Sequence, residues 1–280
     1  MQFAKKPLAA QYFAIALGLL VGLALGTAHA QTKPKITGIT GPVPENVLWV
    51  GNSFFYYNNG MAGYVGRLLA GAPAADVHPY NSTMITISGS GFDWHEMESY
   101  FRPHAVGYYT FDSKNNIVFT DRKKLWDATI TMDCSQCPIH PTLGKIFPQY
   151  AKSNAVTIRK HGAVPIFFMS WAYADKPEMT AKLAEAYTVA GNANNALVIP
   201  AGLAFARVVK ERPDLVLYQP DNRHPTLMGT YLAASTVYSA LYRRSPEQNS
   251  YTAGLPPDVA RYLRVTAWKT AQDYYGTTEE

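Results

Sequence analysis

Cysteine is scarce in this chain of 280 residues, which has only Cys134 and Cys137, in the sequence Cys-Ser-Gln-Cys. A structural zinc site usually needs two such pairs or nearby histidines, and although His140 is close, no fourth ligand is evident. A redox-active pair normally opens a helix after a strand, whereas here Pro138 follows at once. We therefore expect no metal site, and two interpretations stay open: a local disulfide or two unpaired thiols.

Excess charge is also small. The formal net charge of +5 falls to +3 when the first thirty residues are set aside, because they hold Lys5 and Lys6 but no acidic residue. The remaining basic residues are scattered, as at Lys123-Lys124 and Arg243-Arg244, and form no stripe. A charge this weak and dispersed gives no support for nucleic-acid binding, so we expect no nucleic-acid partner.

Long apolar runs are missing after residue 30. The chain opens with a basic stretch, continues with an apolar run from Phe13 to about Gly26, and reaches Ala28-His29-Ala30 before Gln31. This order is typical of a cleavable signal peptide. The alternative is an uncleaved anchor, but the run is short for a bilayer span, which needs about 20 residues. We therefore expect a signal peptide over residues 1–30, a periplasmic or secreted protein, and no stable membrane span after cleavage.

The rest of the chain shows one regular alternation of short apolar runs and helical patterns, without repeats or an internal domain boundary. A lead-in segment over residues 31–45, rich in Pro, Gly and Thr, precedes a single domain over residues 46–280. Strands are expected at 47–50, 77–87, 128–132, 164–169 and 196–199, and helices at 60–71, 143–160, 177–190, 203–211, 226–241 and 257–275. Such alternation predicts an α/β fold with a mostly parallel sheet and helices on both faces.

Residues 96–126 interrupt this alternation, being aromatic and irregular. A turn is expected at Asn115-Asn116 between two short strands. We interpret the segment as an insertion that covers the main sheet.

Reactive groups in such sheets gather at the carboxyl ends of the strands. Ser53, Gly89 and Asp133 each follow an expected strand, and Asp221 and His224 lie in a loop before a long helix. A serine hydroxyl needs a base to take its proton, and the base needs an orienting partner. Because a three-residue offset in a loop lets a carboxylate fold back on an imidazole, Ser53, His224 and Asp221 are the candidate nucleophile, base and orienter.

The order of these motifs resembles the SGNH (GDSL-like) hydrolase superfamily, and in particular a branch with a Gly-Asn-Ser-Phe first block. The resemblance is carried by Gly51-Asn52-Ser53-Phe54 and by Asp221-Asn222-Arg223-His224-Pro225-Thr226, with support from Val198–Phe205 and Leu217–Pro220. It covers most of the chain, from about Val47 to Tyr242. It implies a flavodoxin-like three-layer α/β/α sandwich, an acyl-enzyme mechanism and no cofactor.

By this resemblance Ser53 is the nucleophile, His224 the base and Asp221 its orienter. The oxyanion hole would include the backbone N–H of Ser53 and of Gly89, with Gly91 as the alternative register. Both glycines stand in Ser88-Gly89-Ser90-Gly91, where the lack of a side chain lets the backbone approach a substrate.

The third block departs from the family pattern. Family members place an Asn after the third strand to complete the oxyanion hole, but Thr131–Pro138 contains none. Gln136 carries the right kind of donor, an amide N–H. An ionised Asp133 close by would instead repel an oxyanion. Losing one such donor typically costs about 100- to 1000-fold in rate.

Two tryptophans near these blocks have alternative interpretations. Trp94, in Asp93-Trp94-His95 after the Gly turn, either lines the pocket or is an ordinary buried residue. Trp171 either faces the site or belongs to the core. In both cases burial is the default expectation for an indole side chain.

The sequence therefore predicts an exported carboxylic ester hydrolase that acts on O-acetyl or other short acyl esters of carbohydrates, so its partner is a small-molecule or glycan ester. The missing Asn motivates an alternative, a catalytically weakened carbohydrate-binding protein on the same fold. A lipase or thioesterase of the same superfamily is a further alternative. No oligomeric state is predicted.

Overall fold

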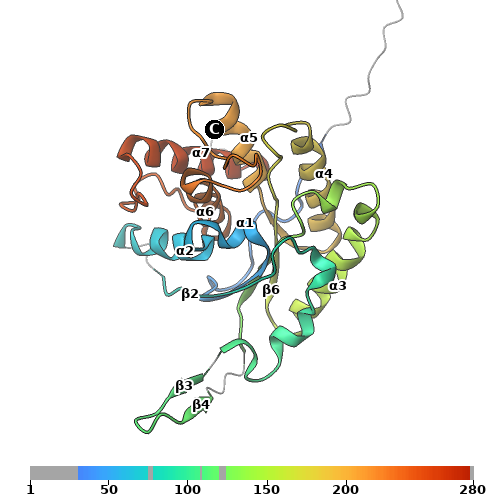
Figure 1. Ribbon diagram of the computed structural model, residues 1–280, viewed down its shortest axis with the longest axis vertical. Coiled ribbons are helices and arrows are strands. Elements are labelled where there is room, and N and C mark those ends of the chain that lie inside the picture. The colour runs from blue at the N-terminus through green and yellow to red at the C-terminus, as the bar shows by residue number, and fades with distance from the viewer. Residues whose placement is uncertain (1–30, 75–77, 108, 120–123, 278–280) are drawn as a thin grey trace, which may run out of the picture. The chain divides into compact units, whose positions relative to one another are not determined.

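The central sheet has five parallel strands in the order β2-β1-β5-β6-β7 (Figure 1). The computed structural model describes residues 31–74, 78–107, 109–119 and 124–277. The strands are β1 (Asn46–Gly51), β2 (Asn81–Thr86), β5 (Ala128–Thr131), β6 (Val164–Phe168) and β7 (Leu197–Ile199). All four pairings are parallel. The expected mostly parallel sheet is confirmed, and the strand ends lie within one residue of the expected ranges, except that β2 begins four residues later than expected.

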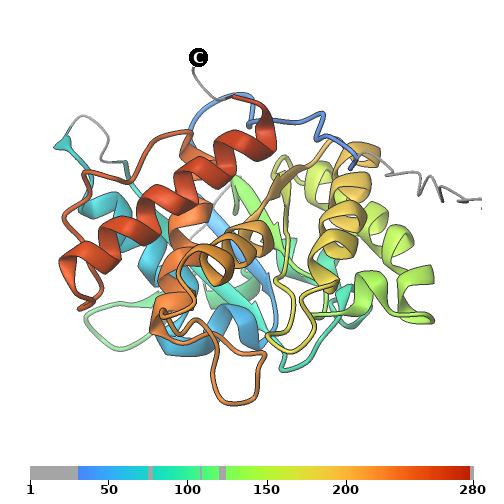
Figure 2. The ribbon, with the colours of Figure 1, turned by 90° about the horizontal axis from the view of Figure 1, so that it is seen from above.

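Helices cover both faces of the sheet, which confirms the three-layer α/β/α sandwich (Figures 1 and 2). The helices α2 (Met61–Ala70), α5 (Ala201–Glu211) and α6 (Leu227–Tyr242) pack on one face of the sheet, and α7 (Pro257–Tyr275) lies outside α6. The other face is covered by α3 (Phe147–Lys160) and α4 (Met179–Ala193). Because α7 covers its outer side, α6 is buried all round and lacks a polar stripe.

The amino end of α3 differs from the expected helix over 143–160. Leu143–Lys145 forms a 3₁₀ turn, and the α-helix begins at Phe147, so Pro148 stands in its first turn. Proline is well suited to this position because it lacks the N–H that the first turn leaves unpaired and has a helical φ already.

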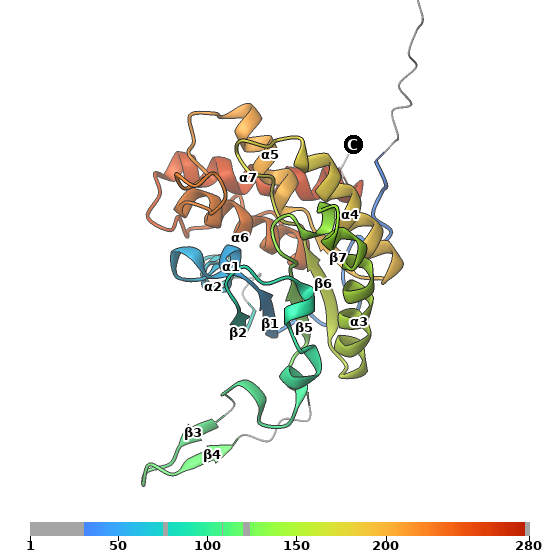
Figure 3. The same ribbon diagram turned by 45° about the vertical axis from the view of Figure 1, so that its right-hand side comes forward.

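The aromatic insertion contains a two-stranded antiparallel hairpin of β3 (Tyr109–Phe111) and β4 (Ile117–Phe119). Its turn includes Asn115, at φ 61°, as expected. The two ends of the segment cover the sheet as expected, because Met97, Phe101 and Trp126 lie in one buried hydrophobic cluster with Leu48 and Val50 of β1. The hairpin between them does not, because it projects away from the sheet (Figures 1 and 3). Alternation along both short strands places four large apolar side chains on one face, and none of them reaches the core; these are Tyr109, Phe111, Ile117 and Phe119.

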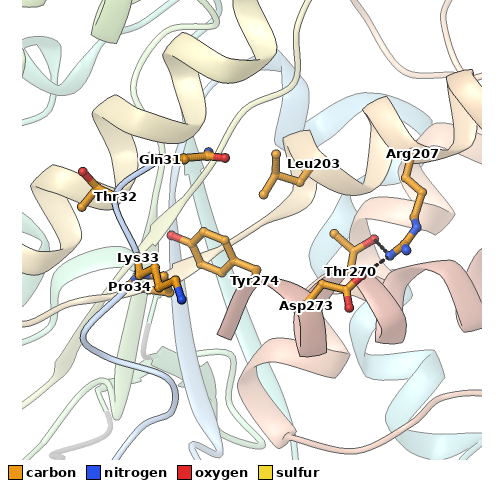
Figure 4. A pocket seen from close by; sticks show the side chains of 9 residues that line it. All are labelled: Gln31, Thr32, Lys33, Pro34, Leu203, Arg207, Thr270, Asp273 and Tyr274. Atoms are coloured by element: carbon orange, nitrogen blue, oxygen red, sulfur yellow. Dashed lines mark hydrogen bonds and ion pairs between the residues drawn. The ribbon is translucent and has the colours of Figure 1, made fainter. Parts of the chain in front are cut away.

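The lead-in segment has no regular secondary structure, yet it is hydrogen-bonded to α4. The Thr32 backbone N–H donates to the carboxylate of Glu185 at 2.9 Å, and the Lys35 N–H donates to the side chain of Asn192 at 2.7 Å. Together with α5 and α7 the lead-in encloses a hollow of about 400 Å³, in which Arg207 is held by Asp273 (Figure 4).

The predicted signal peptide, residues 1–30, lies outside the described residues. Within the described part of the chain, no helix combines the length and the apolar character that a membrane span requires.

Candidate functional site

Asn52 organises the carboxyl edge of the sheet around Ser53. It caps a short helix, α1 (Ser53–Tyr56), by accepting from the N–H of Phe54 at 3.2 Å. Its amide nitrogen donates to the carbonyls of Ser90 at 3.0 Å and Asp133 at 3.2 Å, which follow β2 and β5. One side chain thus ties the ends of three neighbouring strands together, and it fixes the turn that carries Ser53.

Ser53, His224 and Asp221 form one chain of hydrogen bonds. The Ser53 Oγ lies 2.8 Å from His224 Nε2, and His224 Nδ1 lies 2.5 Å from Asp221 Oδ2. Since a carboxylate on Nδ1 fixes the proton there, Nε2 is left to accept from the serine hydroxyl. The structure therefore brings together the three residues that the sequence selected, in the relative order required of nucleophile, base and orienter.

Asp221 is held as a carboxylate by several donors. Its Oδ1 accepts the backbone N–H of Arg223 at 2.9 Å and of His224 at 3.0 Å. Partial desolvation raises the pKa of Asp221, but the hydrogen bonds from His224 and from these backbone groups outweigh it and lower the pKa to about 2. The carboxylate therefore stays ionised throughout the neutral range.

The loop that carries His224 is pinned from neighbouring elements, which the sequence did not predict. Trp171 Nε1 donates to the carbonyl of Arg223 at 2.9 Å, and the Ala174 N–H donates to the carbonyl of Asn222 at 2.9 Å. Asn222 has a φ of 61°, a left-handed conformation that asparagine tolerates better than most residues. Trp171 is fully buried, as the default interpretation held, yet its single polar atom positions the loop.

Two aromatic rings contact the His224 imidazole. Tyr57 stacks on it with ring centroids 4.1 Å apart, and Phe54 meets it edge-on at 5.7 Å. Tyr57 belongs to a short 3₁₀ turn whose next residue, Asn58, donates to the carbonyl of Pro225 at 3.0 Å. In the sequence, the adjacent Tyr56-Tyr57-Asn58-Asn59 carried no signal for this role.

A pocket of about 260 Å³ opens beside Ser53. Its lining includes Ser53, Gly89, Ser135, Gln136, Tyr173 and His224. Within the described residues, the backbone N–H groups of Ser53 and Gly89 have no hydrogen-bond acceptor, so both are available to a ligand. Gly89 has a φ of 73°, a conformation that favours glycine at this position.

The cysteines form a disulfide, Cys134–Cys137, which resolves the choice that the sequence left open. It closes the loop that contains Ser135 and Gln136, both of which line the pocket. The loop is also anchored from outside, because the Ser135 hydroxyl lies 2.7 Å from that of Tyr173. This loop follows β5, in the segment where the sequence lacks the expected Asn.

Asp133 lies behind the pocket rather than in it. Its Oδ1 accepts the N–H groups of Phe92 at 2.8 Å and Cys134 at 2.9 Å. Burial raises the pKa of Asp133 to about 6, although these two hydrogen bonds oppose the shift. The carboxyl group therefore accepts hydrogen bonds from the backbone of the neighbouring loops and does not line the pocket beside Ser53.

No set of three or more metal-ligating side chains is found among the residues that the structure describes.

Comparison with known proteins reveals similarity in structure alone. No family model and no curated protein matches the chain. A DUF4886 family protein from Bacteroides uniformis is similar at 20% identity and a TM-score of 0.55, over 83% of this chain and 96% of that one. A Slackia heliotrinireducens protein assigned as a candidate SGNH hydrolase is similar at 19% identity and a TM-score of 0.50. The similarity covers 70% of this chain and 97% of that one.

A variant of Axe2, an acetyl-xylooligosaccharide esterase from Geobacillus stearothermophilus, is similar at 15% identity and a TM-score of 0.50, over 70% of this chain and 93% of that one. Together these likenesses show that the chain has the three-layer α/β/α fold of the SGNH hydrolases. Its place in the Gly-Asn-Ser-Phe branch stays a prediction.

Proposed function

We propose that the protein is a serine carboxylic ester hydrolase whose nucleophile is Ser53. The observation that carries this proposal is the hydrogen-bonded chain from Ser53 through His224 to Asp221, which ends at an open pocket. A serine–imidazole–carboxylate chain is the arrangement that raises the nucleophilicity of a serine hydroxyl at neutral pH.

In this mechanism Ser53 Oγ attacks the acyl carbon while His224 Nε2 takes its proton. The N–H groups of Ser53 and Gly89 donate to the oxyanion. His224 then returns the proton to the departing alcohol, which leaves an acyl group on Ser53. Water, activated by the same imidazole, hydrolyses this acyl-enzyme and restores the hydroxyl. Asp221 remains ionised throughout and balances the positive charge on the imidazole.

The lining of the pocket supports a short acyl group. Side chains with polar ends predominate near Ser53, among them Ser135, Gln136 and Arg223, and the guanidinium of Arg223 lies 4.8 Å from the ring centre of Tyr173. A long acyl chain would need a continuous apolar channel, which this lining does not supply. This favours an acetyl or similar ester over the lipase and thioesterase alternatives.

A carbohydrate as the alcohol part of the ester is supported by one prediction from the sequence and one comparison. The predicted signal peptide implies export, to the periplasm or beyond. A protein of the same fold is named an acetyl-xylooligosaccharide esterase. The proposed substrate class is therefore an O-acylated sugar or oligosaccharide.

A serine-directed fluorophosphonate tests the mechanism directly. We expect it to modify Ser53 stoichiometrically, as seen by peptide mass spectrometry, and to abolish hydrolysis of an aryl acetate. Prior incubation with the aryl acetate should slow the modification, because both reagents compete for the same hydroxyl. Folded protein that neither reacts with the probe nor hydrolyses the ester would overturn the proposal and favour a carbohydrate-binding protein on this fold.

A further inference from the structure

A second hollow of about 410 Å³ lies beside the segment that follows Gly89. We call it the Trp94 hollow; its walls include Asp93, Trp94, Glu96, Tyr150, Ser153 and Asn154. They come from the short turns after β2 and from one side of α3. The mechanism above uses none of these residues.

Trp94 is 59% exposed, which corrects the expectation that it is an ordinary buried tryptophan. By contrast, Trp49, Trp126 and Trp171 are almost completely buried. An indole held in short 3₁₀ structure presents a broad, flat apolar face at little cost in side-chain freedom. The apolar face of a sugar ring is a suitable partner for such a surface.

Asn154 lies in the wall of the same hollow, is 3% exposed, and has an amide nitrogen without a hydrogen-bond partner in the described part of the chain. A buried amide is normally hydrogen-bonded, so Asn154 has an unused hydrogen-bonding group in the wall of this hollow. A half-turn of the amide exchanges its nitrogen and oxygen, which allows it to donate to, or accept from, a ligand hydroxyl in the hollow.

The charge of the hollow selects against anionic ligands. Two of the nearby carboxylates are balanced, since Glu98 lies 2.8 Å from Lys160 and Glu96 lies 3.8 Å from Arg102. Asp93 has no ion-pair partner among the described residues. Its carboxylate can accept hydrogen bonds from hydroxyl groups but repels carboxylate, sulfate or phosphate substituents.

We propose that the Trp94 hollow binds a neutral pyranose ring of an oligosaccharide whose acylated sugar lies at Ser53. This rests on the proposed function and extends it to an oligomeric substrate. Gly89 lines the catalytic pocket and Trp94 the hollow, and five residues of extended chain span at most about 18 Å. A short oligosaccharide reaches across that distance, so binding at Trp94 holds the ester at the nucleophile.

Isothermal titration of the purified protein with xylohexaose, cellohexaose and hexagalacturonic acid tests the hollow without any catalytic step. We expect the wild type to bind at least one neutral hexasaccharide and not the anionic one. Trp94→Ala should weaken this binding by about tenfold or more, which corresponds to about 1.4 kcal/mol, because a central aromatic contact commonly carries a large share of the binding free energy. Asn154→Ala should weaken it by a smaller factor.

Phe111→Ala is the matched control, because Phe111 is also an aromatic residue with 59% exposure but lies on the projecting hairpin. It should leave oligosaccharide binding unchanged. Trp94→Ala should keep aryl acetate hydrolysis within about twofold of wild type while raising KM for acetylated xylohexaose.

The experiments distinguish an error in assigning the Trp94 hollow as a binding site from an error in assigning Ser53 as the nucleophile. The assignment of the hollow is overturned if no neutral hexasaccharide binds, or if Trp94→Ala binds as well as the wild type, whatever the esterase activity. Binding that depends on Trp94, in a protein that does not hydrolyse aryl acetate or react with fluorophosphonate, would retain the hollow and overturn the catalytic proposal.

Discussion

Two serine–histidine pairs of nearly equal geometry lie in the described part of the chain, and one of them is arranged as the proposed catalytic pair. Ser53 Oγ lies 2.8 Å from His224 Nε2, and Ser90 Oγ lies 2.9 Å from His95 Nε2. The difference lies at the second ring nitrogen. His224 Nδ1 meets the Asp221 carboxylate, whereas His95 Nδ1 lies 3.0 Å from the hydroxyl of Tyr100.

Access separates the two pairs further. Ser53 opens onto the pocket, while Ser90 is fully buried and donates to the carbonyl of Gly51 at 3.0 Å. Burial lowers the pKa of His95, against weaker opposing effects of the Gly51 carbonyl and Asp93. The buried pair therefore acts as a neutral brace behind the Ser53 turn. A serine–histidine contact by itself does not identify a nucleophile. A carboxylate on the second ring nitrogen of the histidine and access of the serine to a pocket are also required.

The largest effect should separate the two serines. Ser53→Ala should lower kcat for an aryl acetate by about 10⁴-fold or more, because it removes the hydroxyl that His224 Nε2 contacts. Ser90→Ala should keep activity within about tenfold, since it removes only buried contacts, to the Gly51 carbonyl and to His95, behind the Ser53 turn. Steady-state kinetics measures both, with circular dichroism to show that each variant is folded. Equal losses in the two variants would contradict the distinction between the pairs.

The partner of the second ring nitrogen should give the next largest effect. Asp221→Asn should lower kcat by about 10²- to 10⁴-fold, because an amide no longer imposes the tautomer that leaves Nε2 free to accept a proton. Tyr100→Phe makes the corresponding change in the buried pair and should lower kcat by less than about threefold. If Asp221→Asn retained full activity, the role of Asp221 as orienter would be wrong.

The smallest expected effect is a dependence of the free energy of unfolding on pH that arises from His95. A lowered pKa of folded His95 means that, as the pH falls below the unfolded value of about 6.5, the unfolded chain binds a proton that the folded protein does not. The free energy of unfolding should therefore decrease from pH 7.5 to pH 5.

This decrease should be smaller in His95→Gln, which keeps a side-chain N–H for the Gly51 carbonyl but does not titrate. Urea unfolding at the two pH values measures the difference between the variant and the wild type. An identical pH dependence in both proteins would show that His95 does not contribute.

Much of the fold was predictable because periodic burial leaves a strong pattern. Val47-Leu48-Trp49-Val50 is fully buried, as its unbroken apolar run indicated, and α6 and α7 lie within two residues of their expected ranges. The hairpin was predicted by Asn115-Asn116, but its direction was not. Local turn chemistry specifies a hairpin without specifying what it packs against.

The candidate site was predictable only where motif spacing carried it. Ser53, Asp221 and His224 followed from blocks at the ends of elements, and the structure brings them into contact. The contacts of Trp171 with the Arg223 carbonyl and of Tyr57 with the His224 ring were not predicted. In a sequence, a tryptophan or tyrosine near apolar residues has the pattern of a core residue. Their contacts with the His224 loop join segments far apart in the chain.

Sequence alone determined the alternation of strands and helices and the residue types of a serine–histidine–aspartate set, since both depend on local spacing. Tertiary structure decided which serine is accessible, which carboxyl faces away from the pocket, that the cysteines are joined, and that Trp94 is exposed. Each of these depends on which distant backbone or side chain lies nearby, and packing of the whole chain determines those neighbours.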